Sequence, residues 1–232
     1  MDIIDVKNLR FSYDGVKMIL DNIDFTIAKG EMVGIVGDSG CGKSTLCHIL
    51  CGIIPGAIGG EISGHAVVGD IDLREAQLKD MAETVGFVMQ DPDRQIVTSM
   101  VEDELAFGPE NFCIPPEEIR RRVDSVLDML GIDDIRYKDP NRLSGGQKQL
   151  VTIGSVLTLQ PDILILDEPF SHLDEENRKG TMELMKKIRD MGKTIITVEH
   201  DHRLIEDADR WILLEDGRIK AQGKPEELRS II

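Results

Sequence analysis

Residues 37–45 have the composition and spacing of a phosphate-binding loop. The sequence GDSGCGKST fits the pattern G-x-x-x-x-G-K-[ST], with Lys43 and Ser44 after the second conserved glycine. Glycines let successive backbone N–H groups point at phosphate oxygens, and the helix that follows offers its positive end. Lys43 would reach the terminal phosphates, and the Ser44 hydroxyl would bind Mg²⁺. The predicted nucleotide-binding residues are Gly37, Asp38, Ser39, Gly40, Cys41, Gly42, Lys43, Ser44 and Thr45.

Two adjacent acids follow an apolar run farther along the chain. The stretch ILILDEP places Asp167 and Glu168 at the end of a predicted strand that begins at Ile163. Phosphoryl transfer needs positioning, charge neutralisation by a metal, and a group that orients or deprotonates water. At the carboxyl end of its strand, Asp167 can hold Mg²⁺ directly or through water. Two solvated loop acids are the alternative interpretation, which the presence of Lys43 disfavours.

A pentapeptide between these motifs predicts a second anion-binding helix start. The sequence LSGGQ opens a predicted helix over Gly145 to about Leu159, so Ser144 and the glycine amides are placed to hold an anion. The same chain already has a phosphate loop for that purpose. The residues of this signature are Leu143, Ser144, Gly145, Gly146 and Gln147.

The elements around these motifs predict an α/β fold. A short apolar run, Met32 to Gly37, leads into the phosphate loop and then a helix through Leu50, which is the strand, loop and helix order that the motif requires. Later apolar strands alternate with helices and suit a mainly parallel core sheet. The first 30 residues indicate antiparallel strands, and about 91–142 read as a helical lobe inserted into the core. We expect one domain over 1–232, a P-loop NTPase with an N-terminal antiparallel β subdomain and a helical subdomain.

Composition limits the function classes. The chain has 232 residues, of which 41% are hydrophobic, enough for a buried core. Its apolar runs are far shorter than a bilayer span, so membrane work needs a separate partner. A net charge of −16 opposes binding to a phosphate backbone, and no nucleic-acid partner is expected.

Three of the four cysteines lie in or just after the phosphate loop. Cys47 and Cys51 are four residues apart on the predicted helix, where small buried side chains pack against a sheet, and no second pair completes a metal site. Cys41 lies beside Lys43, surroundings that favour a thiolate. Alkylation of Cys41 is therefore expected to inactivate the protein, and ATP is expected to protect it.

Together the motifs resemble the nucleotide-binding subunit of ATP-binding cassette (ABC) transporters over nearly the whole chain. The resemblance implies an ATP hydrolase that uses ATP and Mg²⁺, with Glu168 as the general base for the attacking water. It also implies that Gln90, in VMQDP, contacts the metal and the water, and that His200, in TVEHD, donates a hydrogen bond toward the terminal phosphate. Tyr13 falls where the family stacks an aromatic ring on adenine, whereas His202 is interpreted as a surface residue. The implied metal ligands are Ser44, Gln90 and Asp167.

In the family, two subunits face head to tail, and each signature helix caps the ATP held by the other. The partner here would be an identical chain or a related ATPase. Ser171, His172, Leu173 and Asp174 resemble the D-loop that crosses this interface, although His172 replaces a smaller residue. ATP would then hold the dimer together, and hydrolysis would weaken it.

The stretch 91–111 narrows the resemblance to the ATPases of energy-coupling factor (ECF) transporters, including the cobalt and nickel branch. Its P-x-x-Q-[IL] start and AFGPEN end imply a groove for a transmembrane scaffold subunit, while a membrane substrate-capture subunit binds a vitamin or metal ion. Localisation would be peripheral, on the cytoplasmic side of the membrane. The expected groove contacts are Ile96, Val97, Met100, Val101, Leu105 and Phe107.

Two other functions stay open from the sequence. A soluble ABC ATPase of iron–sulfur cluster assembly would bind cytosolic scaffolds, and AFGPEN argues against it. A genome-maintenance or ribosome-acting ABC protein would need a long coiled coil or a second cassette, and neither is evident. The cargo is not encoded here, because the cassette does not touch it.

Overall fold

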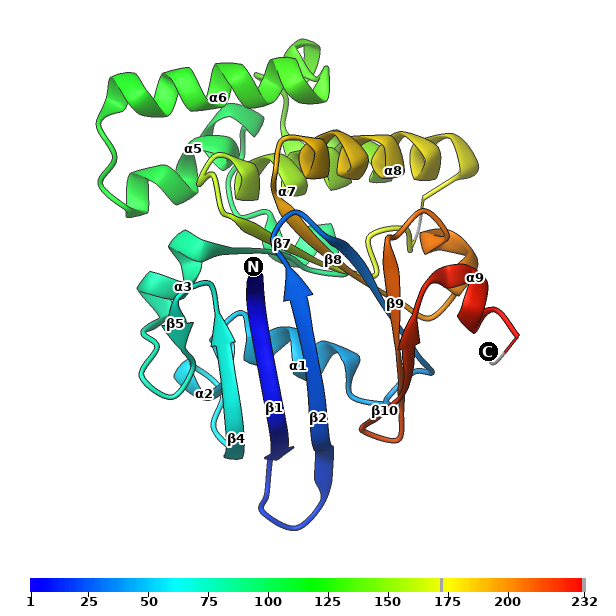
Figure 1. The fold of residues 1–232 in the computed structure, drawn as a ribbon. Coiled ribbons are helices and arrows are strands. Elements are labelled where there is room, and N and C mark those ends of the chain that lie inside the picture. Colours follow the sequence, from blue (N-terminus) through cyan, green and yellow to red (C-terminus); the bar gives the residue numbers. More distant parts are fainter. Residues whose placement is uncertain (172, 231–232) are drawn as a thin grey trace.

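The computed structural model describes residues 1–171 and 173–230. Its N-terminal part forms an antiparallel sheet with strand order β2-β1-β4-β5, drawn in blue and cyan in Figure 1. Alternate side chains of β2 are buried, the period expected of strands with one face on a core. The strands are β1 (Asp2–Ser12), β2 (Met18–Ala28), β4 (Glu61–Val68) and β5 (Ile71–Asp72). The predicted N-terminal antiparallel subdomain is therefore confirmed.

The second sheet has the order β10-β9-β3-β8-β7-β6. All neighbouring pairs are parallel except β9 and β10, which form a hairpin. Its inner strands are buried on both faces, as parallel strands between two layers should be. The strands are β3 (Met32–Val36), β6 (Val85–Val88), β7 (Ile163–Asp167), β8 (Thr194–Glu199), β9 (Arg210–Glu215) and β10 (Arg218–Gly223). The predicted parallel core is confirmed.

Alternation along these strands divides the core between two faces. Val33 and Ile35 face a cluster shared with the antiparallel sheet and with α1 (Lys43–Leu50), whereas Met32 and Val36 face a cluster shared with α7 (Gly145–Leu157) and α8 (Glu175–Asp190). Because the phosphate loop follows β3 and the acids follow β7, both motifs emerge at the carboxyl-terminal edge of one sheet.

A helical subdomain covers one end of the sheet, shown in green in Figure 1. Its core includes Val101, Leu105, Val123, Leu127 and Val151, contributed by three helices. The last of these residues belongs to α7, so the signature helix packs on the helical subdomain and on the core sheet at once. The helices before it are α4 (Pro92–Gln95), α5 (Val101–Asn111) and α6 (Pro116–Leu130), followed by the 3₁₀ turns η1 (Asp133–Ile135) and η2 (Pro140–Arg142).

Several predicted boundaries differ from the structure. The helix expected to reach Leu159 ends at Leu157, and β6 ends at Val88, so Gln90 lies in the following loop. The glycine-rich connection contains α2 (Ile53–Gly56). The remaining short helices are α3 (Leu78–Thr84), η3 (His202–Ile205) and α9 (Pro225–Leu228). Across the described residues, no helix combines the length and apolar composition of a membrane span.

Candidate nucleotide-binding and hydrolysis site

The backbone of the phosphate loop binds the side chain of Lys43. Lys43 is buried, and its ammonium donates to the backbone oxygens of Gly37 (2.7 Å) and Asp38 (2.9 Å). Gly42 precedes α1 with φ 111°, which an L-residue rarely adopts, and a Cβ at Gly37 would lie 2.1 Å from the Leu214 carbonyl oxygen. The first turn of α1 carries neither a side-chain cap nor an acid, so its N–H groups are available to an anion. These features fit the phosphates of a nucleotide.

The three predicted metal ligands share one cavity. Ser44, Gln90 and Asp167 line a space of about 330 Å³. Asp167 is buried, and burial raises its pKa, although a hydrogen bond with Ser44 acts in the opposite direction. A hydroxyl, an amide and a carboxylate offer the oxygen atoms that Mg²⁺ prefers. The donor set therefore fits a magnesium ion.

The three predicted catalytic residues meet at one carboxylate oxygen. The Gln90 amide donates to Glu168 Oε2 at 2.8 Å, and His200 Nδ1 lies 3.5 Å from the same atom. The backbone of Glu168 has φ 46°, a conformation that costs a non-glycine residue free energy and is concentrated at functional sites. Side chains that follow β6, β7 and β8 thus converge where a water-activating group is needed.

Sequence reasoning missed Glu199, the last residue of β8. Its side chain is buried; Oε1 accepts from the Phe170 N–H at 3.4 Å, and Oε2 lies 3.8 Å from His200 Nδ1. Burial raises its pKa to about 8, and the neighbouring Glu168 charge acts in the same direction. The signal in the sequence was the one charged residue of the strand TIITVE, directly before His200.

The signature residues lie outside the cavity that contains Ser44 and Asp167. Ser144 begins α7 as a capping box: its hydroxyl accepts from the Gln147 N–H at 3.3 Å, and the Gln147 side chain accepts from the Ser144 N–H at 3.2 Å. A Cβ at Gly146 would lie 2.4 Å from Asn177 Oδ1, so this helix start packs closely on α8. Within one subunit, the signature residues therefore do not line the cavity that contains Ser44 and Asp167.

The predicted D-loop joins β7 to α8, and His172 lies outside the described residues. Asp174 caps α8 by accepting from the Asn177 N–H at 2.8 Å, and Leu173 is buried. Ser171 lines a cavity together with Gln90 and the signature residues Leu143 and Gly145. The D-loop therefore borders both the hydrolysis site and the signature helix.

Tyr13 extends from the antiparallel sheet to the phosphate loop. Its ring packs edge to face on Phe11, with centroids 4.7 Å apart, and its hydroxyl is 3.1 Å from Thr45 Oγ1. Nearly half of the Tyr13 side chain is exposed, so a ring face is available for stacking. Stacking of Tyr13 on adenine stays a prediction.

One prediction about a single residue is wrong. Cys41 is 8% exposed, and its burial raises the thiol pKa more than the nearby Lys43 lowers it, so the thiol form is favoured rather than the thiolate. His202 is partly exposed, and its ring packs against Trp211 with centroids 5.5 Å apart. Cys47 and Cys51 are buried in the core as expected.

The expected groove contacts differ in exposure. Val101 and Leu105 are fully buried in the helical subdomain, so their assignment to the groove is wrong; they point inward at helical spacing. Val97 and Phe107 are exposed, and Ile96 and Met100 are partly buried.

Glu104 is a buried carboxylate in the same segment and is 3% exposed. Its Oε2 accepts from the N–H groups of residues 97 and 98, at 3.0 and 2.9 Å.

Comparison with known proteins agrees with this geometry. The family described as ABC transporter matches residues 20–171. The chain is 40% identical, over 228 residues, to the energy-coupling factor transporter ATP-binding protein EcfA of Methanosarcina acetivorans, covering 98% of this chain and 81% of that protein. It is 41% identical, over 229 residues, to EcfA1 of Ligilactobacillus salivarius, covering 98% and 79% of the two chains.

Solved structures share the fold. The structure of cbiO1 from Clostridium perfringens, part of the ABC transporter complex cbiONQ, has a TM-score of 0.90 at 33% identity and covers 99% of this chain and 91% of that one. A dimeric post-hydrolysis ATP-binding cassette, bound to ADP and Pi, has a TM-score of 0.82 at 28% identity, covering 96% and 98%. The fold and site define a P-loop ATPase with a signature helix. The chain belongs to the ABC transporter family and is an ATP hydrolase of the ABC type.

Proposed function

We propose that this chain is the ATP-hydrolysing subunit of an ECF-type importer, which dimerises on ATP and drives uptake of a vitamin or a transition-metal ion. One observation supports the hydrolysis: the side chains of Gln90 and His200 both lie close to Glu168 Oε2. The transport assignment is supported by similarity to EcfA proteins over nearly the whole chain and by the fold shared with a member of a cbiONQ complex.

In the proposed reaction, the phosphate loop binds the ATP phosphates and Tyr13 stacks on adenine. Mg²⁺, held by Ser44, Gln90 and Asp167, would neutralise phosphate charge. Glu168 accepts a proton from water, whose oxygen attacks the γ-phosphorus while the bond to the β,γ-bridging oxygen breaks. His200 donates a hydrogen bond to the γ-phosphate. The products are ADP and inorganic phosphate.

The second half of each site comes from another subunit. In this chain the signature residues do not line the cavity of Ser44 and Asp167. A head-to-tail partner, identical or related, would place its own Ser144-containing helix start on the bound γ-phosphate. A dimeric cassette that binds ADP and Pi shares this fold, which supports dimer formation.

Exposed apolar residues supply the proposed contact with the membrane subunits. Val97 and Phe107 flank the buried Glu104 and lie on the helical subdomain. We propose that they receive a transmembrane scaffold subunit, which in turn binds the substrate-capture subunit, on the cytoplasmic side of the membrane. The iron–sulfur alternative is not favoured by the EcfA relatives.

Affinity purification of the tagged chain from detergent-solubilised native membranes tests the proposal. We expect two hydrophobic membrane proteins to co-purify in stoichiometric amounts, and a Val97→Asp, Phe107→Asp double variant to lose them while it keeps basal ATP hydrolysis. Recovery of the chain with cytosolic iron–sulfur scaffold proteins, and with no membrane protein, would contradict the transport assignment.

A further inference from the structure

One buried polar side chain in the signature helix has no role in the proposed reaction. Gln149 lies on the face of α7 that also carries Ile153 and Val156, at positions i, i+4 and i+7. It is 3% exposed. Among the residues that the structure describes, no acceptor lies within hydrogen-bonding distance of its Nε2. A buried donor without an acceptor costs free energy. We therefore expect another state of the protein in which Gln149 Nε2 is paired.

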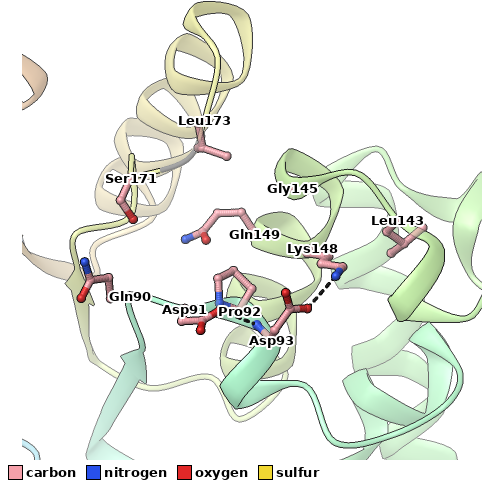
Figure 2. Close-up of a pocket in the computed structure, with 10 residues that line it drawn as sticks. All are labelled: Gln90, Asp91, Pro92, Asp93, Leu143, Gly145, Lys148, Gln149, Ser171 and Leu173. Atoms are coloured by element: carbon pink, nitrogen blue, oxygen red, sulfur yellow. Dashed lines mark hydrogen bonds and ion pairs between the residues drawn. The ribbon is translucent and has the colours of Figure 1, made fainter.

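Gln149 lines a cavity where three functional segments meet. The cavity, about 170 Å³, lies between the loop after β6, the start of α7 and the D-loop. Figure 2 shows the Gln149 side chain extending from α7 toward Ser171 and Gln90. The lining residues are Gln90, Asp91, Pro92, Asp93, Leu143, Gly145, Lys148, Gln149, Ser171 and Leu173.

On one side of this cavity, an ion pair connects α7 with α4. Lys148, adjacent to Gln149 on α7, donates to Asp93 Oδ1 of α4 at 2.6 Å (Figure 2). The signature helix is therefore connected to the segment after Gln90, whereas no hydrogen bond among the described residues joins Gln149 Nε2 to the D-loop. Movement of α7 toward the D-loop would shorten the distance between Gln149 and Ser171.

We propose that Gln149 is a positioning residue, and that its Nε2–H donates to the Ser171 hydroxyl when ATP draws two subunits together. The inference rests on the proposed function, because the closed state is the ATP-bound dimer. The hydrogen bond would connect the signature helix to the D-loop of the same subunit. The start of that helix, which binds the ATP of the partner subunit, would then move together with the D-loop, which lies beside Glu168. Open subunits retain the unpaired donor, which lowers their stability and favours closure.

The test compares Gln149→Met with its parent, both carrying Glu168→Gln so that ATP stays bound. Methionine keeps the length of the side chain and removes its polar atoms. The nucleotide-free variant should melt about 2–4 °C higher, because the unpaired donor is gone. Its ATP-dependent dimer should be about 5–10-fold weaker by sedimentation, because the hydrogen bond of the closed state is lost. Gln77→Met, at an exposed glutamine before α3, is the control that should change neither quantity.

Opposite changes in stability and association separate a positioning role from a packing role. A variant that melts lower and dimerises less would show that Gln149 only fills the core, and a variant with unchanged association would show that the closed state does not use it; either result overturns the inference. In the wild-type background, Gln149→Met should lower kcat and leave the binding of a fluorescent ATP analogue to the monomer unchanged.

Ser171→Ala identifies the acceptor. If the two side chains form one hydrogen bond, the double variant should dimerise no more weakly than either single variant. Additive losses would rule out this pairing. A Glu168→Gln parent that stays monomeric with ATP would contradict the proposed function and this inference together, whereas a parent that dimerises normally and a Gln149→Met variant that matches it would contradict this inference alone.

Discussion

At the scale of single residues, the structure adds side-chain contacts and a backbone conformation to what the motif says about Glu168. Its carboxylate accepts from Gln90 and faces His200, and its backbone is in a conformation unfavourable for a side chain. The motif predicted which acid would activate water, but not these contacts. The burial of Glu199 and Gln149 could not be predicted, because the sequence does not reveal whether a polar residue is buried or paired.

Replacing Glu168 with glutamine should abolish most hydrolysis and leave ATP binding intact. The amide keeps the size of the side chain but cannot accept a proton, so kcat should fall by about 10²–10⁴-fold. Phosphate release measures the rate, and a fluorescent ATP analogue measures binding. Glu83→Gln, at an exposed position, is the control and should behave as wild type. Full activity of Glu168→Gln would remove this residue from the base role.

Glu199 should make stability depend on pH. Its pKa is raised by burial from an ordinary 4.5 to about 8, so the native state holds a proton that the unfolded chain releases between these values. Stability contributed by the protonated form is therefore complete below about pH 4.5 and is lost as the pH rises to about 8. Glu199→Gln cannot ionise. In thermal melts from pH 5 to 8.5, its melting temperature should rise relative to that of wild type as the pH increases. An equal pH dependence of the two melting temperatures would contradict the raised pKa of Glu199.

At the scale of elements, α7 is the point of contact between the helical subdomain and the core. Val151 packs toward the former, whereas Ile153 and Val156 pack toward the latter. Apolar periodicity predicted the helices and strands well, since it follows directly from the geometry of each element. It could not predict which apolar residues of 91–111 face inward, because that depends on which neighbouring helix covers them; hence the error at Val101 and Leu105.

A methyl group at Gly154 should disrupt the packing of α7. Its Cβ would lie 2.8 Å from Leu105 Cδ2, 2.9 Å from Leu130 Cδ1 and 3.2 Å from Val126 Cγ1. We expect Gly154→Ala to lower the free energy of unfolding by about 1–3 kcal/mol. Gly180→Ala in α8 meets no atom within 4 Å and should instead stabilise by about 0.5–1 kcal/mol. Urea unfolding measures both, and equal effects of the two variants would show that the space around Gly154 is not filled.

Glu104 should control the loop that presents Val97. Its buried carboxylate holds the N–H groups of residues 97 and 98, so Glu104→Ala leaves two donors without their acceptor. Amide hydrogen exchange at these two positions should accelerate by about tenfold or more. Exchange should be unchanged for Asp103→Ala, an exposed neighbour on the same helix. Equal exchange in both variants would mean that the carboxylate does not fix the loop.

At the scale of the whole molecule, the candidate hydrolysis site and the signature occupy different places in one chain. The phosphate loop, Asp167 and Glu168 lie at the carboxyl-terminal edge of the core sheet, and the signature residues do not line the cavity that contains Ser44 and Asp167. The order of the motifs predicted the fold, whereas the division of the site between two subunits stays a prediction. The order of motifs could not predict how two copies fit together, because that depends on the shape of the surfaces that meet.

Enclosure of ATP between two subunits can be measured by sedimentation of Glu168→Gln with and without ATP and Mg²⁺. The 25.9 kDa monomer should double in mass when ATP is present, alone or after addition of a related ATPase, and Ser144→Arg in the same background should prevent doubling. A particle that keeps the monomer mass at saturating ATP, with identical and related chains both present, would contradict it.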